Sequence, residues 1–138
     1  MRHRDEFGRV GLHYAARDGD LTLITQLLQA GEDVDVRDGE GWTPLHFAAQ
    51  EADPAAIALL LDAGADVDAV TANGMPAIYW AATAASGDPI ASIRVLRAAG
   101  ADPTAETIQS YFGSRSALHY IRDFTNRPEI AAEFADLA

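Results

Sequence analysis

The chain has 138 residues, of which 49% are hydrophobic and 22% are charged, and it contains no cysteine. This length fits one domain with a shared core, and the missing cysteines exclude disulfides, thiolate chemistry and cysteine-ligated zinc. The formal net charge of −11 disfavours nucleic acid and anionic lipid as partners, and it favours either a basic partner or a purely solubilising role.

The N-terminal residues 1–10 lack the apolar segment of a signal peptide. The longest apolar runs, such as residues 55–61, are too short to cross a membrane. We therefore expect a cytoplasmic protein.

A five-residue segment recurs along the chain, which indicates a repeat architecture. Its copies are Leu12–Ala16, Leu45–Ala49, Ile78–Ala82 and Leu118–Arg122. The first three copies are 33 residues apart and the fourth follows after 40. The recurring glycines Gly31, Gly64 and Gly100 place a three-residue insertion within 84–89 and a longer connection, four extra residues, before the last unit.

Each unit predicts two short helices and a turn. In the second unit, Thr43 suits the N-cap and Pro44 the first position of a helix. Residues 52–54 end that helix, and Gly64 suits the left-handed residue that ends the next one. Apolar residues at i, i+3 and i+4 give each helix one buried face, namely Leu45, Ala48 and Ala49, then Ile57, Leu60 and Leu61. Because such a pair cannot bury these faces alone, the units must stack on one another.

This pattern resembles the ankyrin repeat. Residues 43–49, TPLHFAA, contain the Thr-Pro-Leu-His-x-Ala motif of that family at its period of 33. The resemblance implies an all-α ankyrin-repeat solenoid of stacked helix-turn-helix pairs, with turn fingers on one side. We expect one domain over 1–138, with units at about 5–37, 38–70, 71–104 and 105–138. Its composition, rich in alanine, arginine and aspartate, is similar to that of bacterial stand-alone members.

The last unit departs most from the motif. Ile121 and Arg122 stand where the other units have alanine, as expected of a degenerate capping unit. The final helix is expected to begin near Pro128 and to turn Ile130, Phe134 and Leu137 inward.

No set of residues predicts catalysis or a cofactor. His13, His46 and His119 share one motif position, where the resemblance implies that histidine bonds to backbone and threonine and braces successive fingers. The aspartates of the repeated turns are expected to bond their own backbone, and they do not follow the calcium-loop pattern. Residues 113–117, GSRSA, lack the second glycine of a nucleophile elbow. We predict a non-enzymatic protein with no catalytic residue, metal or cofactor.

The aromatic residues allow two interpretations. Tyr14, Phe47, Trp80 and Tyr120 share one motif position and could form a ligand ladder, but packing along the first helices is favoured. Trp42 stands at a finger tip, either stacked on its neighbours or exposed at an interface. The interface is favoured because a tryptophan there has little to pack on in its own repeat, and aromatic side chains dominate binding hot spots.

The resemblance implies that partners meet the finger tips and the exposed side of each first helix. The candidate partner-binding residues are Glu6, Phe7, Arg9, Glu40, Trp42, Asn73 and Met75 on the fingers, and Arg17, Asp18, Gln50, Glu51 and Thr83 on the first helices. The insertion at 84–89 and the long finger at 105–113 are either specificity elements or tolerated loop variation.

We predict a protein–protein interaction module that binds a protein partner through its finger tips and concave face and is a monomer when alone. A narrower hypothesis is an immunity or inhibitor protein of a basic toxin or nuclease, captured by charge steering. The alternative is a scaffold or regulatory subunit of a larger complex. A third class, an enzyme or ligand-binding protein that uses the inserted region, has no residue set to support it. Nucleic acid and membrane are not expected partners.

Overall fold

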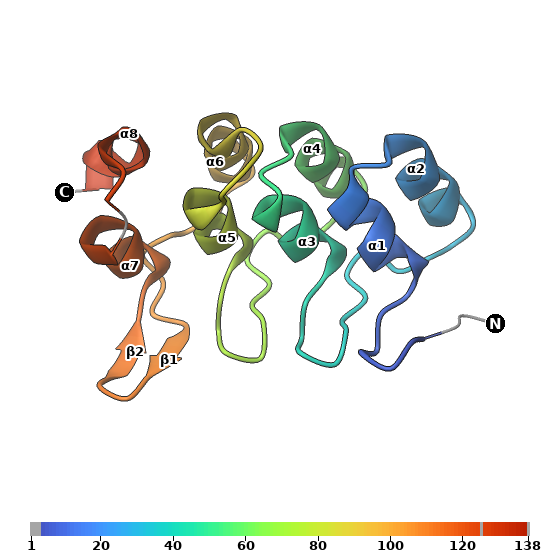
Figure 1. The fold of residues 1–138 in the computed structure, drawn as a ribbon, viewed down its shortest axis with the longest axis horizontal. Coiled ribbons are helices and arrows are strands. Elements are labelled where there is room, and N and C mark those ends of the chain that lie inside the picture. Colours follow the sequence, from blue (N-terminus) through green and yellow to red (C-terminus); the bar gives the residue numbers. More distant parts are fainter. Residues whose placement is uncertain (1–3, 125, 138) are drawn as a thin grey trace.

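The computed structural model describes residues 4–124 and 126–137. The helices form two layers that run in chain order, with loops projecting from one side (Figure 1). The elements are α1 (Gly11–Asp18), α2 (Leu21–Gln29), α3 (Pro44–Gln50), α4 (Pro54–Asp62), α5 (Ala77–Thr83), α6 (Pro89–Ala98), β1 (Ile108–Ser110), β2 (Gly113–Arg115), α7 (Ala117–Phe124), α8 (Pro128–Ala131) and the 3-10 helix η1 (Ala132–Leu137). The helices α1, α3, α5 and α7 contact one another in order, and α2, α4, α6 and α8 form the second layer. No helix in the described part of the chain is long and apolar enough to cross a membrane.

Local capping explains where α2, α4 and α6 begin and end. The carboxylates of Asp20, Asp53 and Asp88 accept backbone N–H groups three residues on, at 3.1, 3.2 and 3.1 Å. Each of these helices is followed by a glycine with positive φ, which a residue with a Cβ adopts only at a cost. These glycines are Gly31 (95°), Gly64 (95°) and Gly100 (99°).

The core lies between the stacked units. The first-layer helices meet through alanine pairs that are at most 2% exposed, and their small side chains let the backbones approach closely. Larger side chains fill the space under the second layer, where α4 and α6 bury Ile57, Leu60, Ile93 and Leu96 completely. The alanine-rich composition thus corresponds to close helix contacts.

The insertion at 84–89 packs against the connection between α3 and α4. The backbone N–H of Asp88 donates to the carbonyl of Ala52 at 2.8 Å. Gly87 has φ of 75°, and a Cβ there would lie 2.1 Å from the carbonyl oxygen of Glu51. This loop therefore requires glycine at its point of contact.

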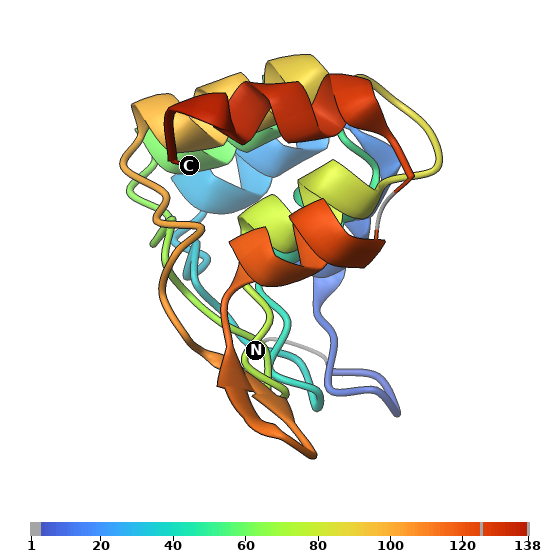
Figure 2. The ribbon, with the colours of Figure 1, turned by 90° about the vertical axis from the view of Figure 1, so that its left-hand side faces the viewer.

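The connection before α7 contains a feature that the sequence did not predict. It forms an antiparallel hairpin, with Ile108 opposite Arg115, Gln109 opposite Ser114 and Ser110 opposite Gly113. The hairpin extends beyond the other loops (Figures 1 and 2). The long finger expected at 105–113 therefore contains a short strand pair that the sequence did not predict.

The C-terminal helices cover the end of the second layer (Figure 2). The final helix begins at Pro128 as predicted, and Ile130 and Phe134 are 1% and 0% exposed. Leu137 is half-buried against the core. Two ion pairs, Arg94–Glu133 and Arg97–Asp136, both at 2.7 Å, join α6 to this segment.

Candidate protein-binding surface

The projecting loops, called fingers below, comprise residues 5–9, 38–42, 71–75 and 106–116. Backbone hydrogen bonds connect each finger to the next, so the tips form one continuous row (Figure 1). The donor–acceptor pairs are Gly39 N to Phe7 O at 2.8 Å, Ala72 N to Glu40 O at 2.9 Å and Gln109 N to Asn73 O at 3.2 Å. Such a ladder holds the tips in fixed relative positions.

In the first three fingers, a polar side chain accepts backbone N–H groups of its own finger. Asp38 Oδ1 accepts the backbone N–H groups of Glu40 and Trp42, both at 2.9 Å. Asp5, 33 residues earlier, accepts two backbone N–H groups in the same way and receives the hydroxyl of Tyr14, which lowers the pKa of its carboxyl group. In the third finger Thr71 takes this place and accepts the N–H of Met75 at 3.2 Å. The residues that accept these backbone N–H groups, Asp5, Asp38 and Thr71, therefore recur every 33 residues, as the helices do.

Histidines brace the first helices against the fingers, as predicted for two of the three. His46 Nδ1 accepts the backbone N–H of Thr43 at 3.0 Å, and Nε2 donates to the carbonyl of Ala69 at 3.0 Å. The threonine hydroxyl is 2.9 Å from the same Nδ1, so it donates to it. Because Nε2 faces a carbonyl and Nδ1 faces an N–H, the ring is neutral with its proton on Nε2. Burial lowers the pKa of His46 to about 4.

The other two histidines differ in how far they follow this arrangement. His13 Nδ1 accepts the N–H of Val10, and Nε2 lies 2.9 Å from the carbonyl of Val36. Burial lowers the pKa of His13 as well. His119 Nδ1 instead lies 3.2 Å from the carboxylate of Asp123, one turn along its own helix. The predicted bracing therefore holds for His13 and His46, and His119 contacts a carboxylate of its own helix.

Three of the five turn aspartates bond to their own backbone, as predicted, whereas Asp35 and Asp68 accept the backbone N–H groups of Asp66 and Asp102 in the next unit, at 3.0 and 3.4 Å. Asp33, Asp66 and Asp102 each accept the N–H group two residues on, at 3.0, 3.0 and 2.9 Å. Across residues 4–124 and 126–137 there is no cluster of three or more acidic or histidine side chains placed to hold a metal ion.

A groove of about 600 Å³ lies between the first two fingers and is called the finger groove below. It is lined by Glu6, Phe7, Gly8, Arg9, Gly39, Glu40, Trp42, Phe47 and Gln50. The guanidinium of Arg9 lies 4.8 Å from the ring centre of Phe7 and 5.0 Å from that of Phe47. Its Nε donates to Asp38 at 3.2 Å. The groove therefore combines aromatic faces with a charged rim formed by Glu6 and Glu40, whose side chains are exposed.

A family model described as ankyrin repeats, in three copies, matches residues 12–107. The chain belongs to the ankyrin-repeat family. A comparison with curated proteins found no match. Ankyrin repeats are non-enzymatic protein–protein interaction modules, and the stacked helix pairs confirm the predicted solenoid.

The ankyrin stack brings half of the twelve candidate binding residues together in the finger groove. These are Glu6, Phe7, Arg9, Glu40, Trp42 and Gln50. Arg17, Asp18 and Glu51 instead line a second groove of about 440 Å³ near the start of α4 and the insertion. Arg17 and Asp18 end α1 and Glu51 caps the C-terminus of α3, directly after Gln50, which lines the finger groove.

The remaining three candidates line neither groove. Asn73 is exposed at the tip of the third ankyrin finger. Met75 packs partly buried against the core, and the hydroxyl of Thr83 donates to the carbonyl of Tyr79 at 2.9 Å. Of these three, Asn73 is exposed, whereas Met75 and Thr83 are partly buried.

Trp42 is better packed than its position in the motif suggested. Its ring centre lies 5.0 Å from that of Phe47 in the same ankyrin unit and 4.6 Å from that of Trp80 in the next. The expectation that it has little to pack on was therefore wrong. The side chain remains half-exposed and lines the finger groove, so it is both stacked and accessible.

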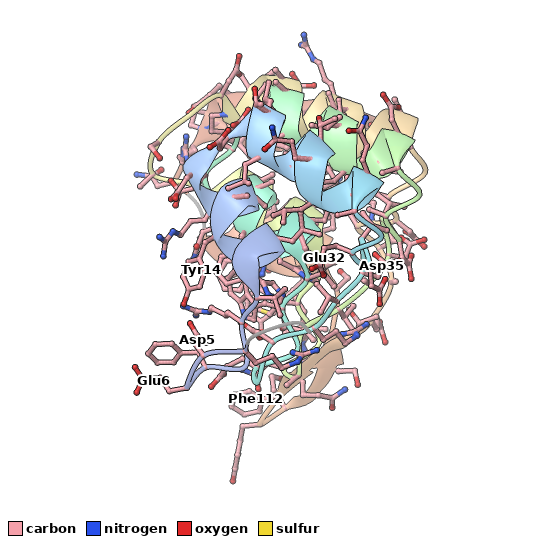
Figure 3. The ribbon with its side chains drawn as sticks, turned by 90° about the vertical axis from the view of Figure 1, so that its right-hand side faces the viewer. Asp5, Glu6, Tyr14, Glu32, Asp35 and Phe112 are labelled. Carbon is pink, nitrogen blue, oxygen red and sulfur yellow. The ribbon has the colours of Figure 1, made fainter. Side chains whose placement is uncertain are left out.

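The residues that sequence reasoning missed are Tyr111 and Phe112. They form the tip of the ankyrin hairpin finger and are 96% and 79% exposed (Figure 3 labels Phe112). The available signal was a pair of adjacent aromatic residues inside an inserted, otherwise polar finger.

Proposed function

We propose that this ankyrin-repeat protein binds a basic protein partner through the finger groove. The observation that carries the proposal is the combination of aromatic faces and carboxylates around one groove, because this combination suits an arginine or lysine side chain. Trp42 supplies a half-exposed ring, and Glu6 and Glu40 supply charges on either side.

Arg9 illustrates the chemistry within the molecule. Its guanidinium already lies between two aromatic rings and pairs with Asp38, whose side chain is 1% exposed. A partner's cation would meet the outer part of the same groove, where the rim carboxylates face solvent.

The charge of the whole chain supports a basic partner. A net charge of −11 raises the rate of encounter with a positively charged surface, and it repels anionic partners. The backbone ladder between fingers adds affinity by a different route, since prearranged tips lose little conformational entropy on binding.

The narrower proposal is that the protein inhibits a basic toxin or nuclease as its immunity protein. Inhibition of this kind needs one rapidly captured partner, which fits a strongly charged monomer with an aromatic-lined groove. The alternative is a scaffold or regulatory subunit. The second groove, rimmed by Asp18 and Glu51, would then bind an additional partner.

Affinity purification from the source cell tests the proposal. The wild-type chain is the bait, together with Glu40→Arg and a matched control, Asp62→Arg, which makes the same charge change on exposed α4 away from the groove. We expect a basic protein that binds wild type and control alike, with affinity for Glu40→Arg lowered about tenfold or more. Recovery of no basic partner, or equal losses in both variants, would contradict the proposal. Recovery of several unrelated proteins would favour the scaffold.

A further inference from the structure

The hairpin finger is rigidly mounted on the stack. Ile108 at its base is 3% exposed, and the hydroxyl of Thr107 donates to the carbonyl of Gly74 at 2.7 Å. The approach is so close that a Cβ on Gly74 would lie 1.7 Å from the carbonyl oxygen of Thr107. Together with the bond from Gln109 to Asn73, these contacts fix the direction in which the hairpin projects.

The tip is itself an ordered turn. Ser110 Oγ donates to the carbonyl of Gly113 at 2.5 Å and accepts the backbone N–H of Phe112 at 3.2 Å. Gly113 has φ of 101°, which closes the two-residue loop. The turn therefore presents Tyr111 and Phe112 from a defined backbone.

Among residues 4–124 and 126–137, the rings of Tyr111 and Phe112 contact each other and form an exposed apolar wedge. Their centres are 5.2 Å apart and their planes are perpendicular, at 88°. Aromatic side chains of this size bury about 150–250 Å² each when they enter a partner, with few rotatable bonds to fix. Large exposed aromatic pairs of this kind are typical of interaction sites.

The charge of the molecule decides between possible occupants. A second copy of the chain would bring another −11 to the contact, and an anionic membrane would repel it as well. At the base of the hairpin, Glu106 is exposed and Arg115 is half-buried, so these two charges offset each other and the net charge of the chain decides the preference. Charge complementarity therefore favours a folded protein whose apolar pocket is bordered by basic groups.

We propose that Tyr111 and Phe112 are a second anchor, which inserts into an apolar pocket of the same basic partner that occupies the finger groove. This inference rests on the proposed function. The finger groove lies between the first two fingers, and the hairpin is the last finger of the same row. All fingers project from the same side of the stack, so one partner surface can contact both (Figure 1).

The test measures dissociation constants with the basic protein that the wild-type chain recovers, after its purification. The variants are the double substitution Tyr111→Ser with Phe112→Ser, the groove variant Glu40→Arg, and Gln109→Ser as a control on the same hairpin. We expect the double variant to bind at least about 30-fold more weakly, because buried aromatic anchors dominate interface energies, and the control to stay within about threefold. A photo-crosslinking phenylalanine analogue at position 111 should join to apolar residues of the partner that lie beside arginine or lysine.

The outcomes separate the two proposals. If Glu40→Arg weakens binding and the double variant does not, the hairpin proposal is wrong and the groove stands. If only the double variant weakens binding, the groove proposal is wrong. Vesicles of phosphatidylcholine, with and without phosphatidylserine, and sedimentation of the chain alone test the other occupants. If the wild-type chain binds vesicles or self-associates and the double variant does not, the proposed insertion into a pocket of a partner protein is wrong. Recovery of no basic protein would contradict both proposals.

Discussion

Acidification should destabilise the fold through His46, and the size of the effect follows from its pKa. In the unfolded chain this imidazole binds a proton at about pH 6.5, whereas burial lowers the pKa in the folded protein to about 4. Nε2–H donates to Ala69 and Nδ1 accepts from Thr43, so a second proton would break the latter bond.

The sign follows from linkage. Since the unfolded state binds the proton first, the stability contributed by neutral His46 is complete above about pH 6.5 and is lost as the pH falls toward 4. Each pH unit within this window removes about 1.4 kcal/mol, so the full window corresponds to about 3 kcal/mol. The lowered pKa of His13 acts in the same direction.

Urea unfolding measured at several values between about pH 7 and pH 4.5 is the assay. We compare wild type with His46→Asn and with His119→Asn, a control whose ring is half-exposed beside Asp123. The His46 variant should be less stable at neutral pH but should lose less stability on acidification, while the control should stay close to wild type in stability at neutral pH. Nuclear magnetic resonance titration of the ring protons reads the pKa directly. Equal slopes in wild type and His46→Asn, or a His46 pKa near 6.5, would refute the reasoning.

Four further substitutions test the packing and the ion pairs. Gly74→Ala should lower the free energy of unfolding in urea by more than about 2 kcal/mol, because its Cβ would lie 1.7 Å from a backbone carbonyl oxygen. Gly64→Ala has φ of 95° but no atom within 4 Å of the added Cβ, so it should cost only about 1–2 kcal/mol. Equal losses in the two variants would contradict this reasoning. Arg97→Ala removes a paired contact to η1 and should lower stability by about 1 kcal/mol and speed amide exchange in η1, and unchanged exchange would count against that role. Arg9→Ala leaves Asp38 buried without its cation and should cost about 1–3 kcal/mol, so a neutral result would show that the backbone bonds to this carboxylate suffice.

The helix pairs were predictable because their determinants are local. In TPLHFAA, Thr43 and His46 are three residues apart, which places them on one turn where their bond can form. His13 forms the equivalent bond to Val10, which has no hydroxyl. The common partner is therefore a backbone N–H, and this explains why the first unit keeps its brace without threonine.

The candidate site could be predicted only in part, because the candidate residues of the first helices line two different grooves. Residues of the first helices were assigned to one surface, yet α1 has eight residues and is therefore about 12 Å long. That length places Arg17 and Asp18 in a different groove from Phe7. Sequence spacing identifies a helix face but not the groove that a side chain lines, since the neighbours Gln50 and Glu51 line different grooves.

The packing of Trp42 and the hairpin depended on contacts that the sequence does not encode locally. Trp42 meets Trp80, a residue of a different motif position in the next unit, at 4.6 Å. The hairpin turn is Tyr-Phe followed by glycine, without the Asn-Gly signal typical of two-residue loops. Its strands are held by the third finger, so the neighbouring unit determines their structure.

The central claim is that the acidic, aromatic finger groove receives a basic protein. Titration calorimetry of the recovered partner into wild type, Glu40→Arg and Asp62→Arg tests it most directly. Binding should weaken about tenfold or more for the groove variant alone, and the wild-type affinity should fall as salt is raised. Indistinguishable affinities for the three chains, with no dependence on salt, would show that the partner binds elsewhere and that charge does not guide it.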